Sequence, residues 1–172
     1  MNKQNRFKRL WQHWLHPRQR VERYFPTAGL KKVSEQIAQS ENQHHGEIRF
    51  VVESRLATAA VLQGLDTRTR AWQWFGELSV WNTEYNTGVL VYISFADRAV
   101  EIVVDRGISA QVPDESWTVV CQHILTKFQQ QQFVAGLELG LQEVNQILIQ
   151  YFPNQHPDHE DINELPNDVV LR

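Results

Sequence analysis

The sequence predicts an α/β fold, a three-layer α/β/α sandwich in which a small mixed central sheet is flanked by helices. Apolar segments rich in β-branched residues alternate along the chain with segments of helical periodicity, which is typical of this class. Two of the predicted strands, Val89–Phe95 and Ala99–Val104, are separated by only three residues, so they form an antiparallel hairpin. We expect helices on both faces of the sheet.

The composition indicates one globular domain with flanking segments. The 172 residues are 42% hydrophobic and include six tryptophans, which is enough for a substantial core. Cys121 is the single cysteine, which excludes an intramolecular disulfide and a cysteine-rich zinc site. No apolar run approaches the roughly 20 residues that span a bilayer, and no secretory signal is present. We therefore expect a cytoplasmic protein, at the membrane surface if its basic N-terminal segment binds there.

We divide the chain into a basic aromatic arm, residues 1–26, an α/β domain, residues 27–153, and an acidic tail, residues 154–172. Residues 1–33 contain nine Lys or Arg residues against Glu22 alone, a net charge of +8 that leaves −11 for the rest of the chain. This asymmetry indicates a partner for the arm, or docking of the arm on its own body. Nucleic acid is not an expected partner, because the acidic body repels phosphates.

The arm combines aromatic and basic side chains at helical spacing. Trp11 and Trp14 are its bulkiest apolar residues, and Arg6, Lys8 and Arg9 lie among them. On a helix the apolar residues group on one side with cations opposite, as in segments that lie at a membrane interface. Two interpretations stay open. Either the arm contacts a membrane or a protein partner, or its aromatic residues pack on the domain.

The first elements of the domain follow from capping and alternation. Residues 27–43 are predicted to form a helix with Thr27 as its N-cap. The first strand is predicted at Glu47–Glu53, where apolar residues alternate so that every second side chain shares a face. Those on one face are Ile48, Phe50 and Val52. Residues 54–65 are predicted as a loop with a helical turn.

Three further helices complete the domain. They are predicted over residues 67–78, 114–130 and 133–152. Thr67 and Asp114 are the expected N-caps of the first two. In the tail, Asn163–Leu171 can dock as an extended strand or peptide.

The candidate chemistry lies in acids near the ends of the predicted strands. No Walker loop, dinucleotide-binding glycine motif, nucleophile elbow or HExxH motif is present. Asp105 and Asp114 are separated by one loop and could converge on calcium or another divalent cation, which takes several oxygen ligands. Asp97 lies at the opposite end of its strand, too far away to join them. Structural roles compete with this interpretation: a helix cap for Asp114, a salt-bridged strand end for Asp105 with Arg106, and a hairpin turn for Asp97 with Arg98.

Several motifs occur in an order and spacing that resemble the TPM domain family, over about residues 28–170. They are GEIRFVVE (Gly46–Glu53), WNTEYNTGVLVYIS (Trp81–Ser94), VEIVVDRGI (Val100–Ile108), the spaced Trp117, Phe128, Phe133 and Gly136-Leu137, YFP (Tyr151–Pro153) and NELP (Asn163–Pro166). The resemblance implies a central sheet flanked by helices. It also implies acid phosphatase activity in some members, calcium binding in others, and roles in assembly or repair.

Individual site residues also match the pattern of this family. Asn86 matches the Asn before the Gly-Val-Leu strand, the pair Asp97-Arg98 matches the hairpin Asp-Arg, and Asp114 matches the Asp that opens the next helix. The sequence departs at Val104–Gly107, where many members read Gly-Tyr-Gly. A ligand would be approached differently there, so neither calcium binding nor phosphatase chemistry follows from the resemblance alone.

Two functions are consistent with the sequence. The first is a non-catalytic interaction module, with a protein partner and peripheral membrane contact through the arm, that serves the assembly or maintenance of a membrane-linked complex. The alternative is a weak metal-dependent acid phosphatase in which Asp105, Asp114 and Arg106 neutralise developing negative charge. Since no nucleophile or general base is evident, the catalytic residues stay unassigned and we favour the interaction module.

Overall fold

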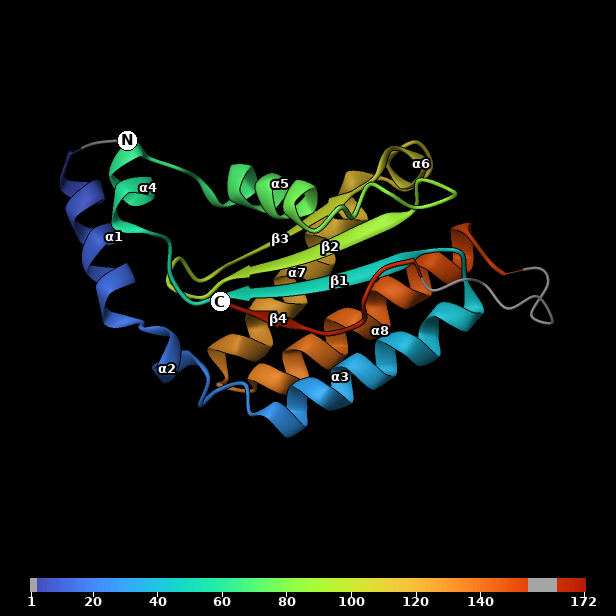
Figure 1. Cartoon of the computed structure of the whole chain (residues 1–172), viewed down its shortest axis with the longest axis horizontal. Helices are drawn as coiled ribbons and strands as arrows, with labels where there is room; N and C mark the ends of the chain where they lie inside the picture. Colours follow the sequence, from blue (N-terminus) through green and yellow to red (C-terminus); the bar gives the residue numbers. More distant parts are fainter. Residues whose placement is uncertain (1–2, 155–163) are drawn as a thin grey trace.

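A mixed four-stranded sheet forms the centre of the molecule (Figure 1). The structure is a computed structural model that describes residues 3–154 and 164–172. Its strands are β1 (Glu47–Glu53), β2 (Gly88–Ser94), β3 (Ala99–Val104) and β4 (Val170–Leu171), in the spatial order β3-β2-β1-β4. The helices lie on both sides of this sheet, so the predicted α/β fold is confirmed.

The strand directions define two ends of the sheet. β1 and β2 are parallel, with Glu47 opposite Gly88 at their start and Glu53 opposite Ser94 at their finish. β4 is parallel to β1, and β3 runs antiparallel to β2 as the predicted hairpin. We call the end where β1 and β2 begin the amino end, and the end where they finish the carboxyl end.

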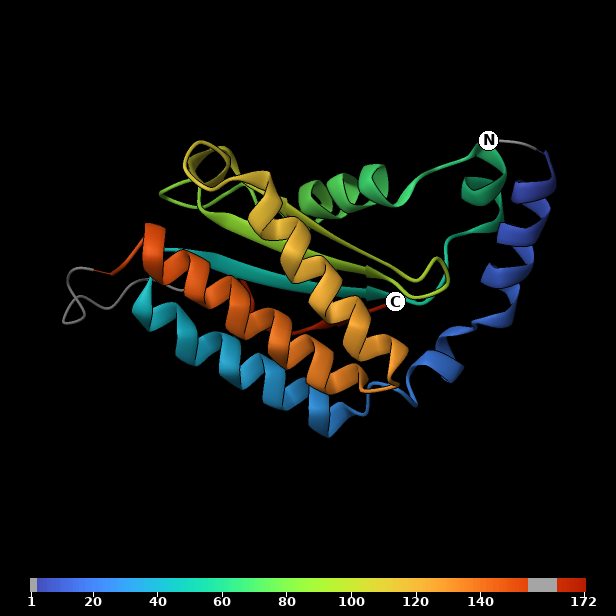
Figure 2. The same cartoon turned by 180° about the vertical axis from the view of Figure 1, so that it is seen from behind.

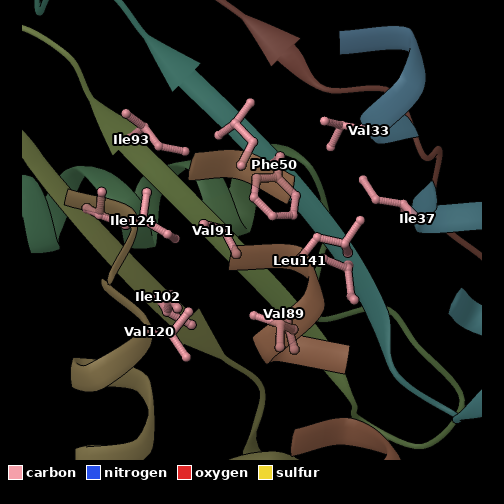
Figure 3. Packing of buried hydrophobic residues seen from close by; sticks show 14 of the residues in the cluster. Val33, Ile37, Phe50, Val89, Val91, Ile93, Ile102, Val120, Ile124 and Leu141 are labelled. Atoms are coloured by element: carbon pink, nitrogen blue, oxygen red, sulfur yellow. The ribbon is translucent and has the colours of Figure 1, made fainter. Parts of the chain in front are cut away.

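Three helices cover one face of the sheet and enclose the larger core (Figures 2 and 3). They are α3 (Thr27–Ser40), α7 (Asp114–Gln129) and α8 (Phe133–Tyr151). Phe50 and Val91 from the strands pack with Ile37, Ile124 and other apolar residues of these helices. Burying each such side chain stabilises the fold by about 1.5–3 kcal/mol, so this face provides most of the packing energy.

The opposite face of the sheet is covered by α5 (Thr67–Glu77), which forms a smaller core (Figure 1). Trp74 and Phe75 of this helix pack with Val51, Leu90 and Tyr92 of the strands. The alternation predicted for β1 is confirmed, because Ile48, Phe50 and Val52 lie in the larger core and Val51 in the smaller one. The result is a helical layer on each side of the strands.

Further helices lie at the two ends of the sheet. At the carboxyl end lie α1 (Lys3–Leu15) and α4 (Thr58–Gln63), with α2 (Arg18–Val21) leading from α1 towards α3 (Figure 1). At the amino end lies α6 (Arg106–Ser109), which the sequence did not predict. The predicted helix over residues 27–43 is α3 followed by a 3₁₀ turn, η1 (Glu41–Gln43).

The helices begin at the predicted places, but the three predicted N-caps are wrong. Thr27 is the first helical residue of α3, and Pro26 before it takes the extended N-cap conformation. Asp114 likewise is the first helical residue of α7, and Pro113 before it takes the N-cap position. The proline ring fixes φ near −65°, which suits the cap position, so each of these two helices starts one residue earlier than a cap at Thr27 or Asp114 would give. At α5 the N-cap is Asp66, whose carboxylate accepts from the backbone N–H of Thr69.

The tail returns to the sheet. Val170 and Leu171 pair with Val51 and Val52 of β1, which matches the extended segment predicted at the C-terminus. Asn163 of that predicted segment, residues 155–162 of the acidic tail and the side chain of Arg6 lie outside the described part of the chain.

Candidate functional site

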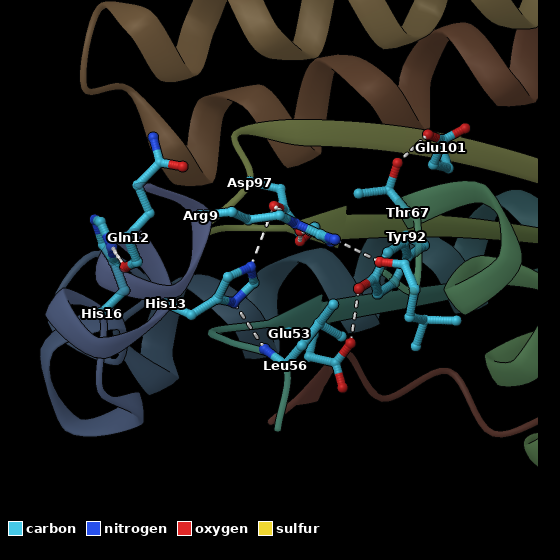
Figure 4. A network of polar contacts seen from close by, with 12 residues as sticks. Arg9, Gln12, His13, His16, Glu53, Leu56, Thr67, Tyr92, Asp97 and Glu101 are labelled. Atoms are coloured by element: carbon cyan, nitrogen blue, oxygen red, sulfur yellow. Dashed lines mark hydrogen bonds and ion pairs between the residues drawn. The ribbon is translucent and has the colours of Figure 1, made fainter. Parts of the chain in front are cut away.

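A charged cluster joins α1 to the hairpin at the carboxyl end of the sheet (Figure 4). Asp97, in the turn between β2 and β3, lies against Arg9 of α1. Arg9 donates from Nε to Oδ1 at 2.7 Å and from Nη2 to Oδ2 at 2.9 Å. Ser94 at the end of β2 also donates to Oδ2, at 2.9 Å. This two-bonded arrangement is the strongest geometry for an Arg–carboxylate pair.

His13 completes the cluster from the next turn of α1. Its Nδ1 accepts from the backbone N–H of Leu56 at 3.0 Å, so the ring proton is on Nε2, which lies 3.1 Å from Asp97 Oδ1. His13 is only 1% exposed. The ring therefore bridges the chain after β1 to the hairpin, and it holds α1 in one orientation.

The environment of Asp97 keeps its carboxylate ionised. Burial by itself would raise the pKa of Asp97, but the hydrogen bonds from Arg9 and His13 outweigh burial and hold that pKa well below its usual range. The same pair raises the pKa of the Arg9 guanidinium. Both carboxylate oxygens of Asp97 accept hydrogen bonds, and two of the donors, Arg9 and His13, belong to α1. The carboxylate of Asp97 therefore fixes α1 to the hairpin. We call the set Arg9, His13, Ser94 and Asp97 the arm latch.

The arm latch turns the aromatic side of α1 to solvent. The apolar residues that follow one another at helical spacing are Phe7, Trp11, Trp14 and Leu15, with 69%, 64%, 62% and 53% of their surface exposed. The rings of Trp11 and Trp14 lie beside each other, with centroids 6.5 Å apart. We call these four residues the arm face. The structure thus docks α1 by its polar residues and leaves its tryptophans uncovered.

Asp105 lies at the amino end of the sheet, far from Asp97, as the sequence predicted (Figure 1). It is the N-cap of α6: its Oδ1 accepts from the backbone N–H of Arg106 at 2.7 Å. Its Oδ2 is buried and has no hydrogen-bond partner among the described residues. The Arg106 side chain is turned to Asn86, with Nε donating to Asn86 Oδ1 at 3.0 Å.

A close backbone approach shapes this amino end. Asn86 has a left-handed conformation, φ 55°, and its carbonyl accepts from the N–H of Gly107 at 3.0 Å. A Cβ atom on Gly107 would lie 2.6 Å from that carbonyl oxygen and 2.8 Å from that of Tyr85. Glycine is therefore required where α6 packs on this loop.

The remaining predicted site residues are exposed. Asp114 lies on the first turn of α7, and no described contact joins it to Asp105. Arg98 follows Asp97 in the hairpin with a left-handed φ of 53°. Among the described residues no group of three or more His, Cys, Asp or Glu side chains is arranged to hold a metal ion. The cation site stays a prediction.

Sequence reasoning missed a second buried polar network, on the α5 side of the sheet (Figure 4). Tyr92 donates its hydroxyl to Glu53 Oε2 at 2.7 Å, and Arg70 of α5 donates to the same carboxylate at 2.9 Å. Burial, and then the charge of Glu53, raise the pKa of Tyr92 above its ordinary range. A signal existed: Glu53 ends a strand directly after three apolar residues, and a buried acid needs a partner.

Nothing in the sequence marked His13 as the partner of Asp97. The two residues are 84 positions apart, and each occurs in an ordinary polar context. Only the packing of α1 against the hairpin brings them together.

The sequence and fold of the chain are similar to those of known proteins. A family model described as the TPM domain matches residues 22–147. The NMR structure of BA42 protein from the psychrophilic bacteria Bizionia argentinensis sp. nov. is 30% identical in sequence and superimposes with a TM-score of 0.71. That match covers 83% of this chain and 92% of the BA42 chain. No curated protein matches the chain. The matched region begins after α1, so the arm face lies outside it.

Proposed function

The chain belongs to the TPM domain family, and we propose that it is an interaction module that attaches to an anionic membrane surface through the arm face of α1. In that position the domain serves the assembly or maintenance of a membrane-linked complex through a protein partner. The proposal is supported above all by one observation: the arm latch fixes α1 with its tryptophans pointing to solvent.

The composition of the arm face favours a lipid surface. Phe7, Trp11 and Trp14 are more than half exposed on a helix that is already held in place by its other side. Apolar groups of this size are costly in water, and a contiguous exposed set marks an interaction site. Tryptophan combines an apolar body with a polar N–H, which suits the boundary between headgroups and acyl chains.

Charge favours an anionic surface and sets the orientation. Lys8 of α1 is exposed, as is Arg20, which donates to the backbone carbonyl of Leu15, and residues 1–21 contain no acidic residue. Basic residues near a membrane gain about 1 kcal/mol each from anionic lipids. Residues 34–172 carry a net charge of −11 and are repelled by the same lipids. Attraction of the arm and repulsion of the body would hold the sheet away from the membrane.

The interfacial location is consistent with the helices of the domain. No helix in the described part of the chain is long and apolar enough to cross a bilayer. The proposal therefore needs only α1 to lie in the plane of the interface, with its apolar side inserted among the headgroups.

Vesicle co-sedimentation tests this proposal. The full chain should bind vesicles that contain phosphatidylglycerol, bind pure phosphatidylcholine vesicles much more weakly, and dissociate as salt rises. The double variant Trp11→Ala/Trp14→Ala should lose most of this binding, because each indole contributes a large share of the inserted apolar area. The arm latch is untouched in this variant, so the fold should be retained.

The matched control is Trp72→Ala/Trp81→Ala, which removes two other exposed tryptophans, 48% and 55% accessible, that lie outside α1. This control should bind like the wild type. Equal loss in both double variants, or binding to neutral vesicles that is unaffected by salt, would rule out the arm face as an anionic-lipid site. A protein that bound no vesicles would point instead to a protein partner for the arm face.

A divalent cation at the amino end is a second candidate function, supported by the buried, unpartnered Oδ2 of Asp105. Hard cations require several oxygens, and Asp114 is the second carboxylate that the sequence suggested. If the two residues share calcium, the ion should raise the Tm of the wild type but not of Asp105→Asn or Asp114→Ala. An equal rise in all three proteins would remove both residues from the site. Metal-dependent hydrolysis of a phosphomonoester, lost in Asp105→Asn, is the result that the acid phosphatase alternative requires.

A further inference from the structure

A cavity of about 420 Å³ lies at the carboxyl end of the sheet, beside the end of β2. Three parts of the chain surround it: the segment after α1 with His16 and Tyr24, the hairpin with Phe95 and Arg98, and the turn between α7 and α8 with Gln131. The volume is in the range of small-molecule sites. The crevice outside the carboxyl ends of parallel strands is also where open α/β sheets bind their ligands. We call it the hairpin cavity.

Aromatic rings form one wall of the hairpin cavity. Tyr24 stacks on Phe95, with ring centroids 5.5 Å apart and planes 18° apart, and it lies 4.8 Å from the ring of Phe133. Phe95 and Phe133 are 5.5 Å apart. These rings come from three separate segments, so the wall exists only in the folded chain. Such a surface favours a flat apolar or aromatic ligand.

The charge of the hairpin cavity is positive. Arg98 lines it, and no acidic residue does among the described lining residues. Asp97, the neighbour that would ordinarily pair with Arg98, is occupied by Arg9 and His13 of the arm latch. Arg98 is exposed, so its guanidinium is available for an anion at the mouth of the cavity.

Two residues with a left-handed backbone lie at the same place. Four non-glycine residues of the described chain have a left-handed φ, and two of them, Arg98 at 53° and Gln131 at 60°, line the hairpin cavity. Each costs about 1–2 kcal/mol relative to ordinary backbone. Gln131 follows the C-cap of α7, where a left-handed residue commonly ends a helix, and Arg98 belongs to the turn of the hairpin, so the local backbone places both residues at the cavity.

We propose that the hairpin cavity binds a small planar aromatic anion, with the ring on the wall of Tyr24, Phe95 and Phe133 and the anionic group on Arg98. The amides of Gln129 and Gln131 line the same cavity and can donate to the anion. This site uses neither the arm face nor Asp105, so it is independent of the function proposed above.

Naphthoate is a suitable probe, because it combines a flat two-ring body with one carboxylate. In an NMR titration of the full chain, we expect naphthoate to shift the amide resonances of Phe95, Arg98 and Gln131. Neutral naphthamide should bind about tenfold more weakly, since a hydrogen-bonded charge pair contributes roughly that factor. Arg98→Gln should weaken naphthoate binding by a similar factor and leave naphthamide unaffected.

The matched control is Arg55→Gln, which removes another exposed arginine that does not line the hairpin cavity. It should bind naphthoate like the wild type. Equal binding of naphthoate and naphthamide, or equal loss in both arginine variants, would overturn the proposal of an anion site. So would shifts confined to the tryptophans of α1, or no binding of naphthoate at millimolar concentration.

Discussion

Arg9 and Asp97, separated by 88 positions in the sequence, form a two-bonded ion pair in which both side chains are almost buried, 13% and 10% exposed. The pair joins the N-terminal helix to the β2–β3 hairpin. It decides which side of α1 faces the body and therefore which side is left for a partner. His13 adds a second bond from the same helix to Asp97 Oδ1.

Removing the carboxylate of this pair should release α1. In Asp97→Ala, Arg9 and His13 lose their shared acceptor, and a nearly buried guanidinium without its carboxylate is strongly destabilising, by about 3 kcal/mol. We expect the amide hydrogens of residues 3–15 to exchange roughly a hundredfold faster than in the wild type. Hydrogen exchange followed by mass spectrometry measures this directly.

The double variant Arg9→Ala/Asp97→Ala is the control for that experiment. It should be less destabilised than the sum of the two single variants, because no unpaired charge remains. If the loss of stability in the double variant equalled the sum of the losses in the two single variants, the Arg9–Asp97 pair would contribute no interaction energy to stability. Since the pKa of Asp97 is depressed in the fold, its contribution is complete above the unfolded Asp pKa of about 3.9 and is lost only as pH falls through the lower folded value.

The network under α5 should depend on the hydroxyl of Tyr92. Tyr92→Phe deletes the donor to Glu53 and leaves that carboxylate with Arg70, so the free energy of unfolding should fall by about 1–2 kcal/mol. Guanidinium denaturation measures the change. Tyr85→Phe, at a tyrosine that is 51% exposed, should alter stability by less than about 0.5 kcal/mol. A Tyr92→Phe protein as stable as this control would contradict the assigned role of the bond.

Glu41 should make the protein less stable as pH rises towards 8. Burial, and then the nearby charge of Glu47, raise the pKa of Glu41 to about 8. The native state therefore retains a proton that the unfolded chain releases near pH 4–5, and stability is lost as pH increases between these values. Glu41→Gln should be more stable than the wild type at pH 8, on the order of 2 kcal/mol, and similar to it at pH 4. Thermal unfolding across this pH range measures the difference.

An exposed acid provides the comparison for Glu41. Glu115 lies on the first turn of α7 and is exposed. The stability of a Glu115→Gln variant should change with pH in the same way as the stability of the wild type. If Glu41→Gln kept the same loss of stability between pH 4 and 8 as the wild type, Glu41 would not be its source.

The sequence predicted the main elements because their signals are local. The alternating pattern of Glu47–Glu53 and the short turn around Asp97 are complete within a few residues, so β1 and the hairpin were placed within one residue of their observed ends. The N-caps were less accurate, because a proline before Thr27 or Asp114 shifts the cap by one residue and both types of residue favour a helix start.

The candidate sites are formed by residues far apart in the sequence, so no pattern within a few residues could predict them. The sequence identified Trp11 and Trp14 as an amphipathic set but could not tell whether they would be buried. That question is answered by Arg9 and His13, whose partner lies more than 80 positions away. The hairpin cavity likewise joins Tyr24, Arg98 and Gln131, which share nothing in the sequence.

By itself, the amino-acid sequence determined the α/β class, the order of the main strands and longer helices, and the separation of Asp97 from Asp105 by the length of a strand. These follow from periodicity and chain geometry, which act over a few residues. The tertiary structure alone decided which side of α1 is exposed and which donors surround Asp97. Those outcomes depend on the packing of distant segments, where one buried ion pair fixes the orientation of a whole helix.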